Sequence, residues 1–527
     1  MSLLLAVDVG TLSARAGLFD VSGRLIVARS HPFELLRPAE HHAVYRMDDI
    51  WSAVATAIRA ALLGTPGAEI VGVAVDATSS TYVEAAGARP LEGDADVICW
   101  MDHRAEPEAE EIGATGDRYL DYVGGSVSPE MYLPKLLWLK RHTPAAWGRV
   151  RLVRDLSDEV ARRLTGTDRL SVCGLACKFP YLPADPAPWR RDLLGALGLG
   201  DLLERGRLGA TPGRVGEVHG HVSTTAAGET GLSAGAPVAI GLIDAEAGAL
   251  GVVGRGFKGA MNRTMALIGG TSSSFMTFAR DERRISGIWG PFRDAVFPGY
   301  WMHEAGMSVS GAALDNVLNQ HPASPGPASA ARHAETARDI LGLLDTEGPG
   351  FAARRHIVPD WLGNRAPQGD GTLRALVMGI GLETSRRAFV EHYYATARAL
   401  ALQSRHIREH LNTRGFAIDR VCLAGGHQRN PLMVRLYRDA LGAELVVSDT
   451  PEPVLLGAAM VAAVAAGVHA DLFEALDAMA PPASVQRADP AYAAANEAAY
   501  RAYLKLFALR NEIEAEGRRP LAAWGDG

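Results

Sequence analysis

An aspartate, a glycine and a threonine stand together at the first bend of the sequence. Asp8 ends an apolar run, and Gly10 and Thr11 separate it from a second β-like run that begins near Ser13. A tight turn of this composition exposes backbone N–H groups and a hydroxyl group, which suit phosphate oxygens. One carboxylate together with phosphates is a common way to hold Mg²⁺. These residue types therefore predict a site for phosphate and magnesium.

The same Gly-Thr turn recurs in the second half of the chain. Residues 6–14 read AVDVGTLSA and residues 266–274 read ALIGGTSSS, with β-like sequence on both sides of each copy. A repeat at about half the chain length predicts two related domains. Two such turns that face each other could clamp a polyphosphate. Ile268 takes the position of Asp8 in the second copy, so one carboxylate would serve the pair.

A third candidate for nucleotide binding lies within residues 421–442. A β-like run ends at Gly425 and Gly426, Asn430 is placed to cap a helix, and Pro431 is placed to begin it. The glycines would let a flat ligand approach the backbone. The same residues would also serve as ordinary punctuation between a strand and a helix. A P-loop is excluded, because none of the five lysines follows a glycine in the pattern GxxxxGK[ST].

A candidate catalytic carboxylate lies in the stretch PVAIGLIDAEAGALG, residues 237–251. Asp244 follows an apolar run there and precedes a helical stretch of small residues. It would act as a general base if a substrate hydroxyl group reached it. Otherwise it would act only as a helix cap.

The elements that must position these residues alternate between β-like runs and amphipathic helical stretches, which predicts an α/β fold. The first three runs predict a three-stranded meander. We expect an N-terminal domain at 1–257, a second domain at 258–475, and a helical extension at 476–527 that packs on the second domain. The predicted strands are 3–8, 14–19, 24–29, 69–75, 81–84, 237–242, 265–268, 275–278, 421–424 and 445–447.

The composition favours small-molecule partners. The 527 residues include 48% hydrophobic and 21% charged residues, and the net charge of -7 offers no basic surface for nucleic acid or an anionic membrane. The start of the chain lacks a basic region, and the longest apolar stretch, 453–467, is shorter than the roughly 20 residues of a membrane span. We therefore expect a cytoplasmic protein. Its cysteines are expected to be reduced thiols, although two of them would share a face of a helix: Cys99, Cys173, Cys177 and Cys422.

Taken together, these stretches resemble the FGGY family of carbohydrate kinases, and the resemblance spans nearly the whole chain. It implies two RNase H-like domains of the sugar kinase, Hsp70 and actin type, with ATP in the cleft between them and the sugar mainly against the first domain. It also implies that Asp244 is the general base and that Asp8 is associated with Mg²⁺. The residues that match the family's ATP-site motifs are Asp8, Gly10, Thr11, Ser13, Gly269, Gly270, Thr271, Ser272, Gly425, Gly426 and Asn430.

Within the family, the sugar-side motifs are most similar to those of the D-ribulokinase and ribitol kinase branch. The motifs are VDATSS at 75–80, WMDHRA at 100–105 and SPEMYLPK at 128–135. One departure bears on the substrate: the stretch HEAGMSVSG has Ala305 and Met307 where the branch usually has glycine and glutamine. The implied sugar-binding residues are Asp76, Thr78, Trp100, Asp102, Glu130 and Lys135, together with Asp244.

The resemblance implies ATP-dependent phosphorylation of the terminal hydroxyl group of a pentulose, with D-ribulose as the preferred substrate and D-ribulose 5-phosphate as the product. Ribitol, L-ribulose, xylulose and a tetritol remain alternatives. A base with a near-ordinary carboxyl pKa suffices for this reaction. A homodimer is common in the family. An alternative of another class is a catalytically silent, sugar-binding regulatory protein, and the presence of both Asp8 and Asp244 argues against it.

Overall fold

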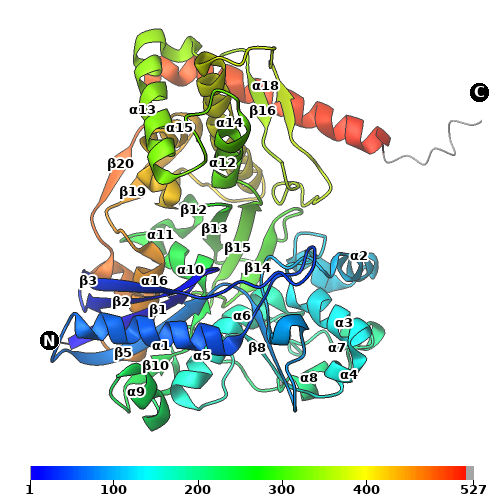
Figure 1. Cartoon of the computed structure of the whole chain (residues 1–527), viewed down its shortest axis with the longest axis vertical. Helices are drawn as coiled ribbons and strands as arrows, with labels where there is room; N and C mark the ends of the chain where they lie inside the picture. Colours follow the sequence, from blue (N-terminus) through cyan, green and yellow to red (C-terminus); the bar gives the residue numbers. More distant parts are fainter. Residues whose placement is uncertain (1, 518–527) are drawn as a thin grey trace, which may run out of the picture.

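The computed structural model describes residues 2–517, in which each half of the chain surrounds a seven-stranded sheet (Figure 1). The first sheet has the order β3-β2-β1-β5-β10-β9, and β11 also pairs with β5. β1, β2 and β3 form the predicted antiparallel meander, whereas β5 runs parallel to β1. The strands are Ser2–Val9 (β1), Ser13–Asp20 (β2), Leu25–Pro32 (β3), Glu69–Ala77 (β5), Val218–His221 (β9), Pro237–Ala239 (β10) and Leu242–Ile243 (β11).

The second sheet repeats this arrangement around β12. β12 pairs antiparallel with β13 and parallel with β18, as β1 does with β2 and β5. Both Gly-Thr turns therefore lie between the first two strands of their sheet, and the α/β fold with two related halves is confirmed. The strands of this sheet, in the order in which they lie side by side, are Trp289–Arg293 (β14), Trp301–Met307 (β15), Ser273–Ala279 (β13), Thr264–Gly269 (β12), Arg420–Gly425 (β18), Glu444–Ser448 (β19) and Ala483–Gln486 (β20).

Two helices fill the space between the sheets. α16 (Pro453–Ala465) is almost wholly apolar and is buried along most of its length. It packs on β1 and β5 although it comes from the second half of the chain. α10 (Asp244–Leu250) crosses it so closely that a Cβ atom at Gly457 would lie 1.9 Å from the carbonyl oxygen of Ala247. This crossing requires glycine and places Asp244 at the border between the halves.

The remaining elements cover the sheets or form smaller units. A four-stranded sheet of the first half has the order β4-β7-β6-β8, and β16 pairs with β17 in the second half. These strands are Val44–Tyr45 (β4), Val97–Ile98 (β7), Thr81–Ala85 (β6), Val150–Asp155 (β8), His356–Val358 (β16) and Leu376–Met378 (β17). The first-half helices are Met47–Leu63 (α1), Glu106–Ala114 (α2), Tyr132–His142 (α3), Pro144–Trp147 (α4), Leu156–Thr165 (α5), Val172–Lys178 (α6), Arg191–Ala196 (α7), Leu202–Arg205 (α8) and Thr224–Thr230 (α9).

One group of second-half helices packs together at the end of the molecule away from the first sheet (Figure 1). They are Gly311–Gln320 (α12), Ala330–Glu347 (α13), Arg386–Asn412 (α14), Pro431–Ala440 (α15) and Pro490–Gly517 (α18). Phe257–Ala260 (α11) and Leu472–Met479 (α17) contact each other instead, and α17 packs on α16. Short 3₁₀ helices are Glu92–Asp94, Arg118–Tyr122, Met261–Arg263, Gly348–Gly350 and Gly426–Arg429. Among residues 2–517, every helix is too short or too polar to cross a bilayer.

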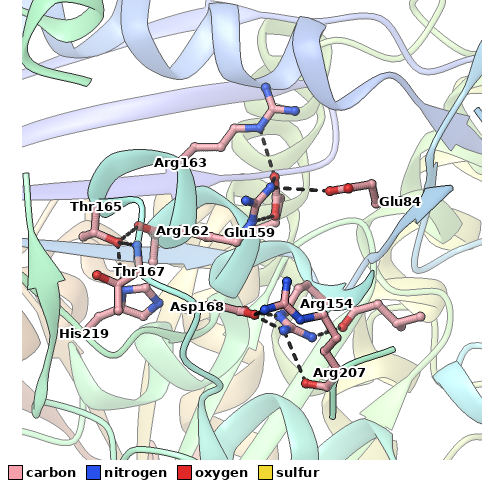
Figure 2. Close-up of polar contacts among 12 residues, drawn as sticks. Glu84, Arg154, Glu159, Arg162, Arg163, Thr165, Thr167, Asp168, Arg207 and His219 are labelled. Carbon is pink, nitrogen blue, oxygen red and sulfur yellow. Dashed lines mark hydrogen bonds and ion pairs between the residues drawn. The ribbon is translucent and has the colours of Figure 1, made fainter. Parts of the chain in front are cut away.

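A polar network surrounds α5 and β8, and it reaches β9 of the first sheet where the hydroxyl oxygen of Thr165 lies 3.2 Å from Nδ1 of His219 (Figure 2). The buried Arg154 donates to Asp168 at 3.0 Å and to the carbonyl oxygen of Gly206 at 2.7 Å. The buried Glu159 accepts from both Arg162 and Arg163, at 2.7 and 3.0 Å. Because each buried charge has a charged partner, we interpret this network as one that stabilises the first half rather than as a binding site.

Candidate active site

A cavity of about 320 Å³ opens between the two halves of the chain. From the first half it is lined by Thr11, Thr78, Ser79, Trp100, Glu130, Lys178, Ile243, Asp244, Ala245 and Glu246. From the second half it is lined by Ile268, Gly269, Gly270, Thr271, Ser272, Ser274, Trp289, Glu304, Arg365, Gly425, Gly426 and Val454. Both Gly-Thr turns, the glycine pair after β18 and the candidate base therefore meet in one place.

Three aspartates lie together where parallel strands of the first sheet end. Asp8 on β1 is opposite Asp76 on β5, and β11 beside β5 leads directly into Asp244. Asp8 is buried in an ion pair with Arg15. Burial raises the pKa of Asp76 well above its ordinary value, and the charges of Asp8 and Asp244 raise it further.

The chemistry of this cluster fits a hard divalent cation. Among residues 2–517, no group donates a hydrogen bond to either carboxyl oxygen of Asp76, although the side chain is fully buried. Buried carboxylates without donors are costly unless a cation compensates them. Mg²⁺ prefers oxygen ligands of this kind, but within residues 2–517 the three carboxyl groups do not come within 4.8 Å of one another as a set, so they fit an ion held mainly through water and phosphate oxygens.

Asp244 is the first residue of α10 and has a partly exposed side chain in the cavity. Its Oδ1 atom accepts a hydrogen bond from the N–H of Ala245 at 2.7 Å. Burial raises the pKa of Asp244 to about 7, and the nearby charge of Asp8 acts in the same direction. In this ligand-free form Asp244 is therefore a stronger base than an exposed aspartate, although the reaction needs no more than an ordinary carboxyl pKa.

In each turn the N–H of the glycine closes the turn, although the first turn is one residue longer than the second. The N–H of Gly10 donates to the carbonyl oxygen of Ser13 at 3.0 Å, and the N–H of Gly270 donates to that of Ser272 at 2.8 Å. Thr11 reaches the cavity, whereas Gly10 and Ser13 close the turn behind it. The hydroxyl oxygen of Thr11 also accepts from Nε1 of Trp100 at 3.1 Å, which ties the first turn to the predicted sugar side.

Glycines bring the ends of β12 and β18 into backbone contact. Gly425 has a φ of +83°, and a Cβ atom there would lie 2.4 Å from the carbonyl oxygen of Gly269. A Cβ atom at Gly269 would lie 2.6 Å from Nδ1 of the buried His427. The cavity wall at this point is consequently bare backbone. Asn430 caps α15 through the N–H of Leu432 at 3.0 Å and does not line the cavity.

The predicted sugar-side residues separate into two groups. Thr78, Trp100 and Glu130 line the cavity. Asp76, Asp102 and Lys135 are fully buried and do not line the cavity. Asp102 binds Arg104 at 2.8 Å and the backbone of Ala43, while the ammonium group of Lys135 donates to the carbonyl oxygens of Cys99 and Trp100 at 2.7 and 3.0 Å. These two residues support the loop that carries Trp100.

Sequence reasoning missed several charged residues of the cavity. Lys178 ends α6, and its ammonium group lies 4.8 Å from the centre of the Trp289 ring. Burial lowers the pKa of Lys178, but the charges of Glu304 and Glu246 outweigh this effect and raise it. The sequence held a signal for both residues. Lys178 is one of only five lysines, and Glu304 precedes Ala305, which departs from the family motif.

The residues that depart from the sugar-side motif lie outside the cavity. Ala305 and Met307 are on β15 and are buried in the core of the second half. Glu304, on the same strand, does line the cavity. The departure therefore changes packing behind the cavity wall, and Glu304 keeps a carboxylate at the wall itself.

An ion pair bridges the two halves across the cavity. Arg365 donates from one nitrogen to both carboxyl oxygens of Glu130, at 2.8 and 3.0 Å, and lies 5.2 Å from the centre of the Trp289 ring. Burial on its own would raise the pKa of Glu130, but Arg365 and His103 outweigh it and hold this pKa at about 2.

The depressed pKa of Glu130 predicts a pH-dependent contribution to stability. The contribution should be complete well above 4.5, the ordinary glutamate pKa, and should be lost as pH falls from there towards about 2. We expect Glu130→Gln to destabilise the protein at pH 7 and to do so less at pH 4, as measured by urea unfolding of both proteins. A difference in unfolding free energy that grows on acidification would contradict this assignment.

Comparison with known proteins gives one consistent result. Residues 3–251 match the N-terminal domain, and residues 265–466 the C-terminal domain, of the FGGY family of carbohydrate kinases. An FGGY carbohydrate kinase domain-containing protein of Xenopus laevis is 34% identical over 97% of both chains. A protein of Saccharomyces cerevisiae named D-ribulokinase is 30% identical over 87% of this chain and 71% of its own. The crystal structure of xylulose kinase from Rhodospirillum rubrum superimposes with a TM-score of 0.80 at 22% identity, over 97% of this chain and 99% of that one.

Proposed function

The chain belongs to the FGGY family of carbohydrate kinases, ATP-dependent sugar phosphotransferases, and from this premise we propose that it phosphorylates the terminal hydroxyl group of a pentulose. D-Ribulose, converted to D-ribulose 5-phosphate, is the preferred substrate, which the relative named D-ribulokinase supports. The observation that carries the proposal is the single cavity in which Asp244 faces both Gly-Thr turns and the glycines after β18.

In the proposed reaction Asp244 accepts the proton of the sugar hydroxyl as its oxygen attacks the γ-phosphorus of ATP. The hydroxyl groups of Thr11 and Thr271 and the N–H groups of the turns hold the phosphate oxygens. Lys178, Glu130 and Trp100 orient the sugar. Mg²⁺, when bound beside Asp8, would neutralise charge on the phosphates.

We also propose a division of the chain that follows its chemistry. Residues 1–257 hold the sugar, and residues 258–475 hold the nucleotide, a boundary supported by the family matches that end at 251 and begin at 265. The proposed extension at 476–527 is supported, over its described part 476–517, by the packing of α18 on α14 and α15, although β20 within it pairs with β19 and belongs to the second sheet. The four cysteines are unpaired, which supports a reducing, cytoplasmic location.

The direct test of the proposed function is a coupled ADP-release assay with a panel of sugars. D-Ribulose, L-ribulose, D-xylulose, ribitol and erythritol are each compared with a reaction that lacks sugar. We expect the largest kcat/KM with D-ribulose and little ADP release without sugar. A higher kcat/KM with another sugar would reassign the substrate, and no sugar-dependent release would favour the silent regulatory protein.

Replacement of Asp8 tests the magnesium assignment. Asp8→Ala is expected to raise the Mg²⁺ concentration at half-maximal activity about 10–100-fold, because a charged group that holds the ion is lost. The measurement is the initial rate as a function of Mg²⁺ at saturating ATP and sugar. Asp20→Ala, which removes a carboxylate at the far end of β2, serves as the control. An unchanged Mg²⁺ dependence in Asp8→Ala would refute the role.

A further inference from the structure

Two buried cysteines lie directly behind the cavity wall. Cys173 and Cys177 are four residues apart on α6 and are fully buried. Glu246 of α10 approaches them from the other side. The two sulfur atoms and one carboxyl oxygen of Glu246 all lie within 4.8 Å of one another. Of the residues in 2–517, these form a compact group of possible metal ligands from two different helices.

Glu246 supplies an independent sign that a ligand belongs here. Its side chain is 1% exposed, and within residues 2–517 no donor forms a hydrogen bond to either carboxyl oxygen. Burial of this carboxyl group carries a desolvation cost, and the nearby charge of Lys178 compensates only part of it, because the pKa of Glu246 is still raised to about 8. A cation held between the carboxylate and the sulfur atoms would remove that cost.

We propose that Cys173, Cys177 and Glu246 bind a thiophilic divalent cation of the Zn²⁺ class. Zn²⁺ is bound by cysteine sulfur and carboxylate oxygen, and three protein ligands leave a fourth position for water. The mixed sulfur and oxygen set distinguishes this site from the all-oxygen cluster around Asp8, which suits Mg²⁺. Because Glu246 also lines the cavity, the ion lies at the wall of the active site.

Binding has a defined chemical balance. Burial raises the pKa of both thiols, so the cysteines are protonated in the metal-free protein. One Zn²⁺ replaces two thiol protons, forms two Zn–S bonds and releases both protons to solvent. The bound ion joins α6 to α10, the helices that carry Lys178 and Asp244, and therefore stabilises the folded state against heating.

The test uses the full-length protein freed of metal with a chelator and titrated with Co²⁺ as a spectroscopic probe. We expect thiolate-to-cobalt charge-transfer absorption that saturates at one ion per chain and disappears when Zn²⁺ is added. The double variant Cys173→Ser/Cys177→Ser should lose this absorption, and Glu246→Gln should bind about 10–100-fold more weakly. Cys422→Ala, which removes another buried thiol outside the cluster, should behave as the unchanged protein does.

A second measurement needs no variant and no kinase activity. X-ray absorption of the unaltered protein with one equivalent of Zn²⁺ should show two sulfur neighbours at about 2.3 Å. The melting temperature should rise on addition of Zn²⁺. Absence of Co²⁺ charge transfer, its persistence in the double variant, or a zinc shell without sulfur would overturn the proposal. These outcomes are independent of the sugar-kinase assay, so failure of the metal site and failure of the proposed function can be told apart.

Discussion

Asp244→Asn is expected to lower kcat about 10²–10⁴-fold while ATP binding persists, because the change removes a positioned general base without altering the size of the side chain. The carboxylate is held in place by its position at the start of α10 and by a hydrogen bond from the N–H of Ala245. The amide oxygen of asparagine can still accept this hydrogen bond. The amide cannot take up the proton of the sugar hydroxyl.

Steady-state kinetics with D-ribulose and calorimetric titration with an ATP analogue measure the two quantities separately. Asp192→Asn makes the same chemical change at an exposed position of α7 and should leave both unchanged. Near-normal turnover by Asp244→Asn would reject Asp244 as the base. Loss of ATP binding together with activity would instead assign it a role in holding the nucleotide.

Lys178→Met should reduce kcat/KM for the sugar by about 10²-fold, with little change in KM for ATP. The buried ammonium group is held charged by Glu304 and Glu246 and faces the cavity beside Trp289. It is therefore a strong donor to a sugar hydroxyl or carbonyl oxygen. Methionine keeps the unbranched shape and most of the length of the side chain and removes the charge.

Lys140→Met is the matched control, because Lys140 forms its ion pair with Asp201 at 2.6 Å outside the cavity. Circular dichroism of both variants checks folding, since Lys178→Met leaves two buried carboxyl groups without a cation. Unchanged sugar kinetics in a folded Lys178→Met protein would exclude a contact with the sugar. An equal decrease of kcat/KM for ATP and for the sugar would mean that the substitution disturbs the whole cavity and not the sugar contact alone.

Local patterns predicted the strands around both Gly-Thr turns, but they missed other strands of the two large sheets, among them β9, β14, β15 and β20. The β-like runs around Asp8 and Ile268 became β1, β2, β12 and β13, and the repeated Gly-Thr turns lie between them as predicted. Asn430 and Pro431 begin α15 as their types indicate. These features depend on residues that are close in sequence, because turn geometry, capping and strand alternation are local properties.

The residues that share the cavity depended on contacts between distant parts of the chain. Lys178, Glu304 and Arg365 come from α6, β15 and the loop after β16, and only the packing of the two halves brings them together. α16 lies on the first sheet although it belongs to the second half, and no local pattern encodes that placement.

Residue types likewise did not reveal where each charge finds its partner. Asp102 and Lys135 match sugar-side motifs, yet Asp102 accepts from the backbone N–H of Ala43, and Lys135 donates to the backbone carbonyl groups of Cys99 and Trp100. The sequence by itself thus determined the duplicated Gly-Thr turns, the strands beside them and the acid at position 244. The tertiary structure decided which charges face the cavity, because burial, ion pairing and pKa arise from neighbours that the folded chain brings together across long separations in sequence.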